Sequence, residues 1–297
     1  MSEGPQRARP VAAILLIILA NSLIPVVDAM AKVLVQREYS VSEVIWSRYF
    51  FHLVPLLACM PFVGWRRMIV SGRLGLQIGR AAVLAAGTGL FIQAISLVPL
   101  AEAYAVSFVS PLILTCLAAW WLKERVGIDQ WLSVGIGLVG VLIVLQPAAG
   151  AVFQAAMLLP LGMATCWALF QVATRSLSFT DGAWTTLFYT GLVGVLGFLP
   201  TAAAAWRMPA TEGDLVLLAA LGIIGLSSHV LIINAFRLAP ASVLAPFVYV
   251  QLIFGILFGF FFFAESVDLT SFLGMALIAL TGLYCVCRQR VPGAETS

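Results

Sequence analysis

Residues 94–126 read "AISLVPLAEAYAVSFVSPLILTCLAAWWLKERV", and residues 235–267 read "AFRLAPASVLAPFVYVQLIFGILFGFFFFAESV". The two stretches align without a gap, and in each an apolar segment, a proline, a second apolar segment and a glutamate follow one another. The constant shift of 141 residues pairs Ala94 with Ala235, Pro99 with Pro240 and Glu124 with Glu265. A repeat of this period predicts that the chain is built from two related halves.

The composition places the chain in the membrane. Hydrophobic residues make up 62% of it and charged residues 10%, whereas ordinary soluble domains hold about 45–50% and about 25%. Apolar runs of about 20 residues are long enough to cross a bilayer as helices. They are too long and too uniformly apolar for the alternating strands of a barrel, so we predict an all-α integral membrane protein.

Ten apolar segments are separated by short polar breaks. Their expected cores are 11–35, 41–63, 76–97, 102–122, 128–146, 152–175, 182–205, 214–236, 240–263 and 268–287. We therefore expect a cytoplasmic tail at 1–10, a first repeat at 11–147 with helices one to five, a second repeat at 148–287 with helices six to ten, and a cytoplasmic tail at 288–297. A proline precedes helices four and nine, which predicts a tight break at Pro99 and at Pro240.

The placement of Lys and Arg predicts the orientation. With both termini inside, only Lys32, Arg37 and Arg207 lie outside, and Arg48 lies within the second helix. The other basic residues lie inside: Arg7, Arg9, Arg66, Arg67, Arg73, Arg80, Lys123, Arg125, Arg175, Arg237, Arg288 and Arg290. This asymmetry follows the positive-inside rule. Because five helices per half is an odd number, the second half enters from the opposite side, as in the inverted repeats that permit alternating access.

The repeated stretches also resemble a known family. The segment "PLAEAYAVSFVSPL", followed by "LKERV", is similar to the middle of ten-helix EamA-type members of the drug/metabolite transporter superfamily. The resemblance implies a metabolite permease of the bacterial inner membrane, and its better-known relatives export amino acids, including aromatic ones. The short four-helix relatives carry a membrane-embedded glutamate for proton coupling in helix one, where this chain has Asp28 near the outer end.

These observations predict a secondary transporter that exports amino acids and related small metabolites by alternating access. The alternative is a permease for another solute, of nucleotide-like or S-adenosylmethionine type, and an integral-membrane enzyme or a channel ranks lower. Neither lysine follows a glycine, which excludes a GxxxxGK[ST] nucleotide loop. We expect no cofactor, metal or nucleic acid, and a monomer or weak homodimer in the bilayer.

Candidate substrate-binding residues are the polar and aromatic side chains of helices one, three, four, six, eight and nine. They are Asp28, Gln93, Tyr104, Ser107, Phe108, Trp167, Gln171, His229, Asn234 and Tyr249. Asp28 and Gln171 would meet the charged groups of a zwitterion, and an aromatic cavity would receive its side chain. Alternatively, Asp28 pairs with Lys32 at the outer mouth, the two amides join helices, and His229 is structural.

Further residues are assigned structural roles. We expect Arg48 to lie shallow, near the outer headgroups or Glu43, because its counterpart in the second repeat is Leu187. We expect the glycines of the segment "GIGLVGV", which are Gly135, Gly137 and Gly140, to permit close helix packing.

Overall fold

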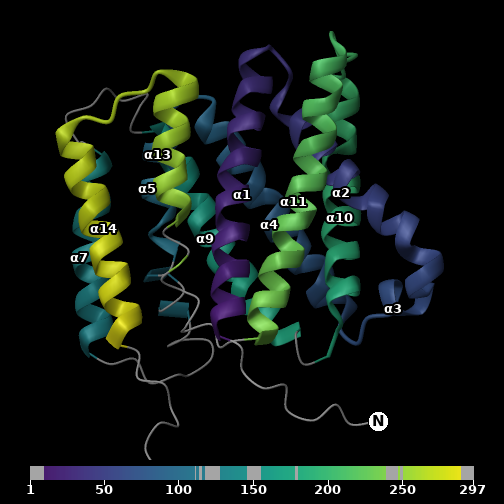
Figure 1. Ribbon diagram of the computed structural model, residues 1–297, viewed down its shortest axis with the longest axis horizontal. Helices are drawn as coiled ribbons and strands as arrows, with labels where there is room; N and C mark the ends of the chain where they lie inside the picture. Colours follow the sequence, from purple (N-terminus) through teal and green to yellow (C-terminus); the bar gives the residue numbers. More distant parts are fainter. Residues whose placement is uncertain are drawn as a thin grey trace, which may run out of the picture.

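The computed structural model describes residues 10–110, 112–113, 116–117, 128–145, 155–177, 180–238, 247 and 250–288 of the chain. These residues form helices and connecting segments, and no strand occurs among them (Figure 1). The helices are α1 (Pro10–Gln36), α2 (Val41–Val63), α3 (Trp65–Ile69), α4 (Leu74–Ile95), α5 (Leu100–Ser107), α7 (Ile128–Leu145), α9 (Leu158–Leu177), α10 (Ala183–Ala204), α11 (Glu212–Leu238), α13 (Val250–Phe263) and α14 (Leu269–Arg288).

Each of the ten expected segments contains a described helix. Among the described residues, α1, α2, α4, α10 and α11 are long and apolar enough to cross a membrane, and further apolar helices are shorter. The break before helix four is confirmed, since extended Pro99 precedes the first residue of α5. Pro240 lies outside the described residues. Helix α3 was not predicted, because five residues are too few to give a periodic signal.

The helix pairs follow the two-fold relation of an inverted repeat. Helices α2, α5 and α7 pack against their own counterparts in the second half, α10, α13 and α14. Helix α1 packs against α11, and the counterpart of α1, which is α9, packs against α4, the counterpart of α11. Exchanging the halves therefore reproduces the pairing. Every long helix of the first half contacts the second half, so the interface between halves runs through the middle of the bundle.

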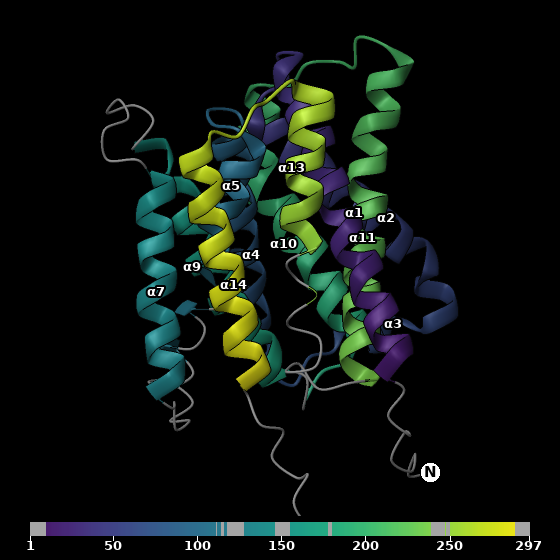
Figure 2. The same cartoon turned by 60° about the vertical axis from the view of Figure 1, so that its left-hand side comes forward.

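The α7–α14 pair stands at one end of the bundle (Figures 1 and 2). Both helices expose large apolar side chains along their length, among them Trp131, Ile136, Phe272 and Leu280, as expected of lipid-facing helices. The prediction of close packing is wrong at Gly135, because a Cβ there meets no described atom within 4 Å. It is confirmed at Gly137, where a Cβ would lie 2.3 Å from the Leu112 side chain.

Gly222 sets the distance between α2 and α11. A Cβ at this position would lie 2.5 Å from the carbonyl carbon of Phe51 and 2.6 Å from the backbone nitrogen of His52. Backbone atoms cannot move aside as a flexible side chain can. Alanine at this position must therefore push the two helices apart.

We expect Gly222→Ala to lower the free energy of unfolding by about 1–3 kcal/mol, the usual cost of overpacking. Gly197→Ala is the matched control, because a Cβ at Gly197 on α10 meets no atom within 4 Å. That control should be neutral or slightly stabilising, since alanine favours helix. Denaturant titration in detergent measures both, and equal stability of the two variants would contradict the close approach of α2 and α11.

Asp181 joins two connections on the predicted inner side. Its carboxylate accepts hydrogen bonds from the Ser71 hydroxyl, the Gly72 N–H at 2.8 Å and the Gln77 amide at 2.8 Å. Partial burial by itself would raise the pKa of Asp181, but these hydrogen bonds outweigh it and hold the pKa below its ordinary value.

The lowered pKa of Asp181 determines how the stability of the fold changes with pH. The stabilisation by Asp181 is fully present above its ordinary pKa of about 3.9 and is lost as the pH falls through the lower folded value. We expect the melting temperature of the wild type to fall more steeply below pH 4 than that of Asp181→Asn. Parallel curves for the two proteins would show that this carboxylate does not stabilise the fold.

Candidate functional site

One face of α1 carries three polar side chains through the bundle. Asn21, Asp28 and Lys32 lie seven and four residues apart, a spacing that keeps them on the same side of a helix. All three are buried, and each contacts a different neighbour. The innermost, Asn21, accepts a hydrogen bond at 2.5 Å from the Gln251 amide on α13. This face of α1 therefore lies against the second half.

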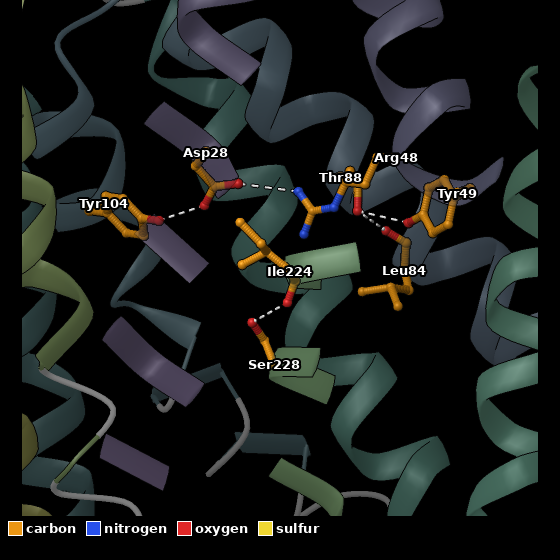
Figure 3. A network of polar contacts seen from close by, with 8 residues as sticks. All are labelled: Asp28, Arg48, Tyr49, Leu84, Thr88, Tyr104, Ile224 and Ser228. Carbon is orange, nitrogen blue, oxygen red and sulfur yellow. Dashed lines mark hydrogen bonds and ion pairs between the residues drawn. The ribbon is translucent and has the colours of Figure 1, made fainter. Parts of the chain in front are cut away.

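Asp28 is the centre of a buried polar cluster. Arg48 on α2 donates from Nη1 to the Asp28 Oδ1 atom at 3.2 Å, and the Tyr104 hydroxyl on α5 donates to Oδ2 at 2.5 Å (Figure 3). The cluster, called the central cluster below, consists of Asp28, Arg48 and Tyr104. It brings together three helices that are separate in the sequence, at a depth where a charge without a partner is unfavourable.

The position of Arg48 corrects the expectation from the sequence. Arg48 points into the bundle and pairs with Asp28, not with Glu43. The expected alternative pair between Asp28 and Lys32 is also wrong, because each has another partner. The Asp28–Arg48 pair has no net charge, which reduces the cost of placing both groups among apolar helices.

Tyr104 is held firmly against Asp28 by packing. Its ring lies 5.1 Å from the Phe91 ring and 6.5 Å from the Phe108 ring, measured between centroids. A Cβ at Gly255 on α13 would lie 2.6 Å from the Tyr104 ring, so α13 covers it closely. Tyr104 and Phe108 are both buried in the hydrophobic core.

A second ion pair lies nearer the predicted outer side. Lys32 donates from Nζ to Glu265 Oε1 at 2.5 Å and to the Val98 carbonyl at 3.1 Å. The other carboxylate oxygen of Glu265 accepts a hydrogen bond from the Leu100 N–H at 2.8 Å. This N–H lies in the first turn of α5, where a backbone donor has no partner within the helix. Glu265 follows α13, so these contacts, called the outer clasp below, join the second half to α1 and α5.

The same side carries another connection between the halves. Asp214 in the first turn of α11 pairs with Arg37 and accepts a hydrogen bond at 3.1 Å from the Tyr39 hydroxyl. The Tyr39 oxygen in turn accepts the Ala210 N–H at 2.9 Å. The connection between α1 and α2 is thereby fastened to the start of α11, and the predicted outer side is closed by polar contacts at two places.

Arg80 forms a different kind of site on the predicted inner side. It was expected inside, at the membrane surface, but it lies within the bundle and is 2% exposed. Its Nη2 atom donates to the Thr190 hydroxyl at 2.6 Å and to the Thr186 carbonyl at 2.9 Å, both on α10. The guanidinium also covers the Phe170 ring at 4.8 Å. Arg80 therefore joins α4 to α9 and α10, with no carboxylate partner among the described residues.

The other candidate residues lie around the central cluster rather than in it. Gln93 bonds to Ser96 near the end of α4, and Asn234 donates to the Val230 carbonyl of its own helix from an exposed position. Ser107 likewise bonds within α5. The remaining positions are Trp167, stacked on Phe170; Gln171, half-buried on α9; and His229, whose ring lies 6.0 Å from His52. Tyr249 lies outside the described residues.

Arg48 is a polar residue whose importance the sequence reasoning missed, whereas Glu265 was expected to pair or cap near a helix start and does so here, with Lys32 and with the Leu100 N–H. Arg48 was set aside because its repeat counterpart is apolar, yet an arginine inside an apolar segment needs an acidic partner at the same depth. Only a few carboxylates lie in the apolar segments, and that scarcity could have indicated Asp28. Among the described residues, no group of three or more His, Cys, Asp or Glu side chains could hold a metal ion.

Comparisons with known proteins give a consistent result. Residues 11–146 and 154–287 each match the model of the "EamA-like transporter family". The chain is 28% identical over 263 residues to an S-adenosylmethionine uptake transporter of Rickettsia bellii, covering 89% of each chain. It is 29% identical over 235 residues to a riboflavin transporter of Vibrio cholerae, covering 79% of this chain and 78% of that one. A solved crystal structure of 16% identity matches with a TM-score of 0.65 over 98% of this chain and all of the other, which shows a shared fold.

Proposed function

The chain belongs to the EamA-like transporter family, and from this membership we propose that it is a secondary transporter of the bacterial inner membrane that moves a small polar metabolite past the central cluster. The observation that carries the proposal is the buried Asp28–Arg48 pair with Tyr104, at the junction of α1, α2 and α5. Ionisable groups inside membrane helices are costly and usually belong to a substrate or ion pathway.

The contacts between the halves support alternating access. The outer clasp and the Arg37–Asp214 pair both join the first half to the second, so opening the outer side requires breaking them. Lys32 corresponds in the repeat to Arg175, and Glu265 corresponds to Glu124. Glu124 and the side chain of Arg175 lie outside the described part of the structure.

The substrate class follows from two considerations. The relatives bear names for uptake of S-adenosylmethionine and transport of riboflavin, which favours the nucleotide-like or S-adenosylmethionine-type solute over amino-acid export. S-adenosylmethionine is itself an amino acid, so the two substrate classes share a head group. We propose uptake or exchange of such a solute, with free amino acids as the second candidate, by a protein that catalyses no reaction.

Flux through the purified protein tests the proposal. The full chain in proteoliposomes should move labelled S-adenosylmethionine without ATP, and empty liposomes should not. Imposing a pH gradient then distinguishes facilitated exchange from proton coupling. Methionine, phenylalanine and riboflavin serve as further labelled solutes. A protein that is folded and inserted but moves none of these solutes would count against this function.

A further inference from the structure

We infer that the substrate presents an α-amino-acid head group to the central cluster, with its carboxylate on Arg48 and its ammonium group on Asp28. The inference rests on the transport function proposed above and adds the chemistry by which the site recognises its substrate. It follows from three features of the cluster: the unused donors of Arg48, the absence of a side chain at Gly225 beside Arg48 Nε, and the charge balance of the Asp28–Arg48 pair.

Arg48 keeps most of its donors free. A guanidinium has five N–H groups in a planar fork, and here Nη1 bonds to Asp28 at 3.2 Å. Within the part of the chain that the structure describes, Arg48 makes no other hydrogen bond or ion pair. Its side chain is 16% exposed, against 5% for Asp28, so the guanidinium is not sealed. The edge formed by Nε and Nη2 can therefore bind a carboxylate with two parallel hydrogen bonds.

Gly225 on α11 faces that edge of the guanidinium. A Cβ at Gly225 would lie 3.8 Å from Arg48 Nε, an ordinary contact distance, and would meet no other described atom within 4 Å. Because glycine lacks this Cβ, no side chain at position 225 covers the Nε edge. Ser228, one turn along α11, donates its hydroxyl to the Ile224 carbonyl at 2.9 Å, which leaves its oxygen free to accept (Figure 3).

Charge balance selects a zwitterion. The Asp28–Arg48 pair is neutral, and each carboxylate oxygen of Asp28 accepts a single donor, from Arg48 and from Tyr104. Further acceptor capacity remains for an ammonium group. A zwitterionic head group adds no net charge to the buried cluster, whereas a simple anion or cation adds one, which the surrounding apolar helices disfavour. Free amino acids and S-adenosylmethionine both carry this head group, and riboflavin does not. The additional positive charge of S-adenosylmethionine is on its sulfonium, outside the head group.

Pairs of probes that differ only in the carboxylate test the inference. The full-length protein in proteoliposomes is given S-adenosylmethionine and decarboxylated S-adenosylmethionine, then methionine and 3-(methylthio)propylamine. We expect the apparent affinity for each carboxylated probe to exceed that for its decarboxylated counterpart by about 30-fold or more, since a buried charge pair is lost without the carboxylate. Because this comparison uses the wild-type protein, it does not depend on the folding of a variant.

A variant pair then assigns the effect to Arg48. Arg48→Lys keeps the charge but loses the planar fork, so it should weaken the carboxylated probes by a much larger factor than the decarboxylated probes. Arg66→Lys is the control, because Arg66 lies on α3 and is exposed. Equal affinities within each wild-type pair, or an Arg48→Lys variant that keeps the wild-type preference for the carboxylate, would overturn the inference.

Riboflavin flux distinguishes an incorrect head-group assignment from an incorrect transport function. Riboflavin flux without flux of either carboxylated probe would overturn the recognition of an amino-acid head group and leave secondary transport standing. Absence of flux for all five probes, from protein shown to be folded and inserted, would overturn both.

Discussion

Asp28→Ala is expected to abolish transport and to lower the free energy of unfolding by about 3–5 kcal/mol, because it leaves Arg48 buried without its carboxylate. The Tyr104 hydroxyl loses its acceptor in the same variant. Both effects arise at one junction, so the measurement must separate a lost binding group from a lost fold. Unfolding in detergent and flux in proteoliposomes are therefore measured on the same preparations.

The double variant Asp28→Ala/Arg48→Met distinguishes the loss of the binding groups from the loss of the fold. Removing both charges and replacing Arg48 by an apolar side chain of similar length should recover most of the stability, since a buried ion pair adds little over good apolar packing. Transport should remain absent, because the binding groups are gone. A stable double variant with wild-type flux would show that the central cluster is structural and takes no part in transport.

Lys32→Glu is expected to break the outer clasp and to reduce turnover by roughly 30-fold or more, the scale set by removing one partner of a buried pair. The new carboxylate would face Glu265 and the Val98 carbonyl. The swap Lys32→Glu/Glu265→Lys should recover part of the activity. Recovery should stay incomplete, because in the swapped protein the Val98 carbonyl faces a carboxylate and the Leu100 N–H faces an ammonium group.

Labelling from one side distinguishes gating from instability. A reporter Ser228→Cys is placed at a buried position of α11, one turn from Gly225, in a background without the five native cysteines. A membrane-impermeant thiol reagent applied from the outer side should label this reporter faster when Lys32 is replaced by glutamate, and near the original rate in the swap. Equal labelling rates in all three proteins would contradict a role of the outer clasp in closing the outer side. Arg66→Glu, on the exposed surface of α3, is the charge-reversal control.

The helices were predictable because apolar length and the repeat are encoded locally. The expected bounds of the second helix, 41–63, agree with α2, and Pro99 marks the start of α5 as predicted. The inverted repeat follows from the odd number of helices per half, and the helix pairing bears it out. Such features depend on spacing along the chain and on backbone restrictions at proline, which a single sequence shows directly.

The partners of the buried charges were not predictable in the same way. Asp28 and Lys32 share a helix face, which made a local pair between them plausible, yet Asp28 pairs with Arg48 on α2 and Lys32 pairs with Glu265, which follows α13. Which partner is reached depends on the rotation and depth of each helix, and hydrophobic periodicity leaves both undetermined. The repeat itself misled the reasoning about Arg48, because ion pairs need not obey the pseudo-symmetry that the backbone follows.

Counterflow tests the central claim most directly. Proteoliposomes loaded with unlabelled S-adenosylmethionine are diluted into a trace of labelled solute, without ATP or an ion gradient. A carrier that alternates around the central cluster predicts a transient accumulation of label above equilibrium in the wild type, and none in the Asp28→Ala/Arg48→Met variant. Simple equilibration without an overshoot in the wild type, or an equal overshoot in the folded double variant, would contradict the account.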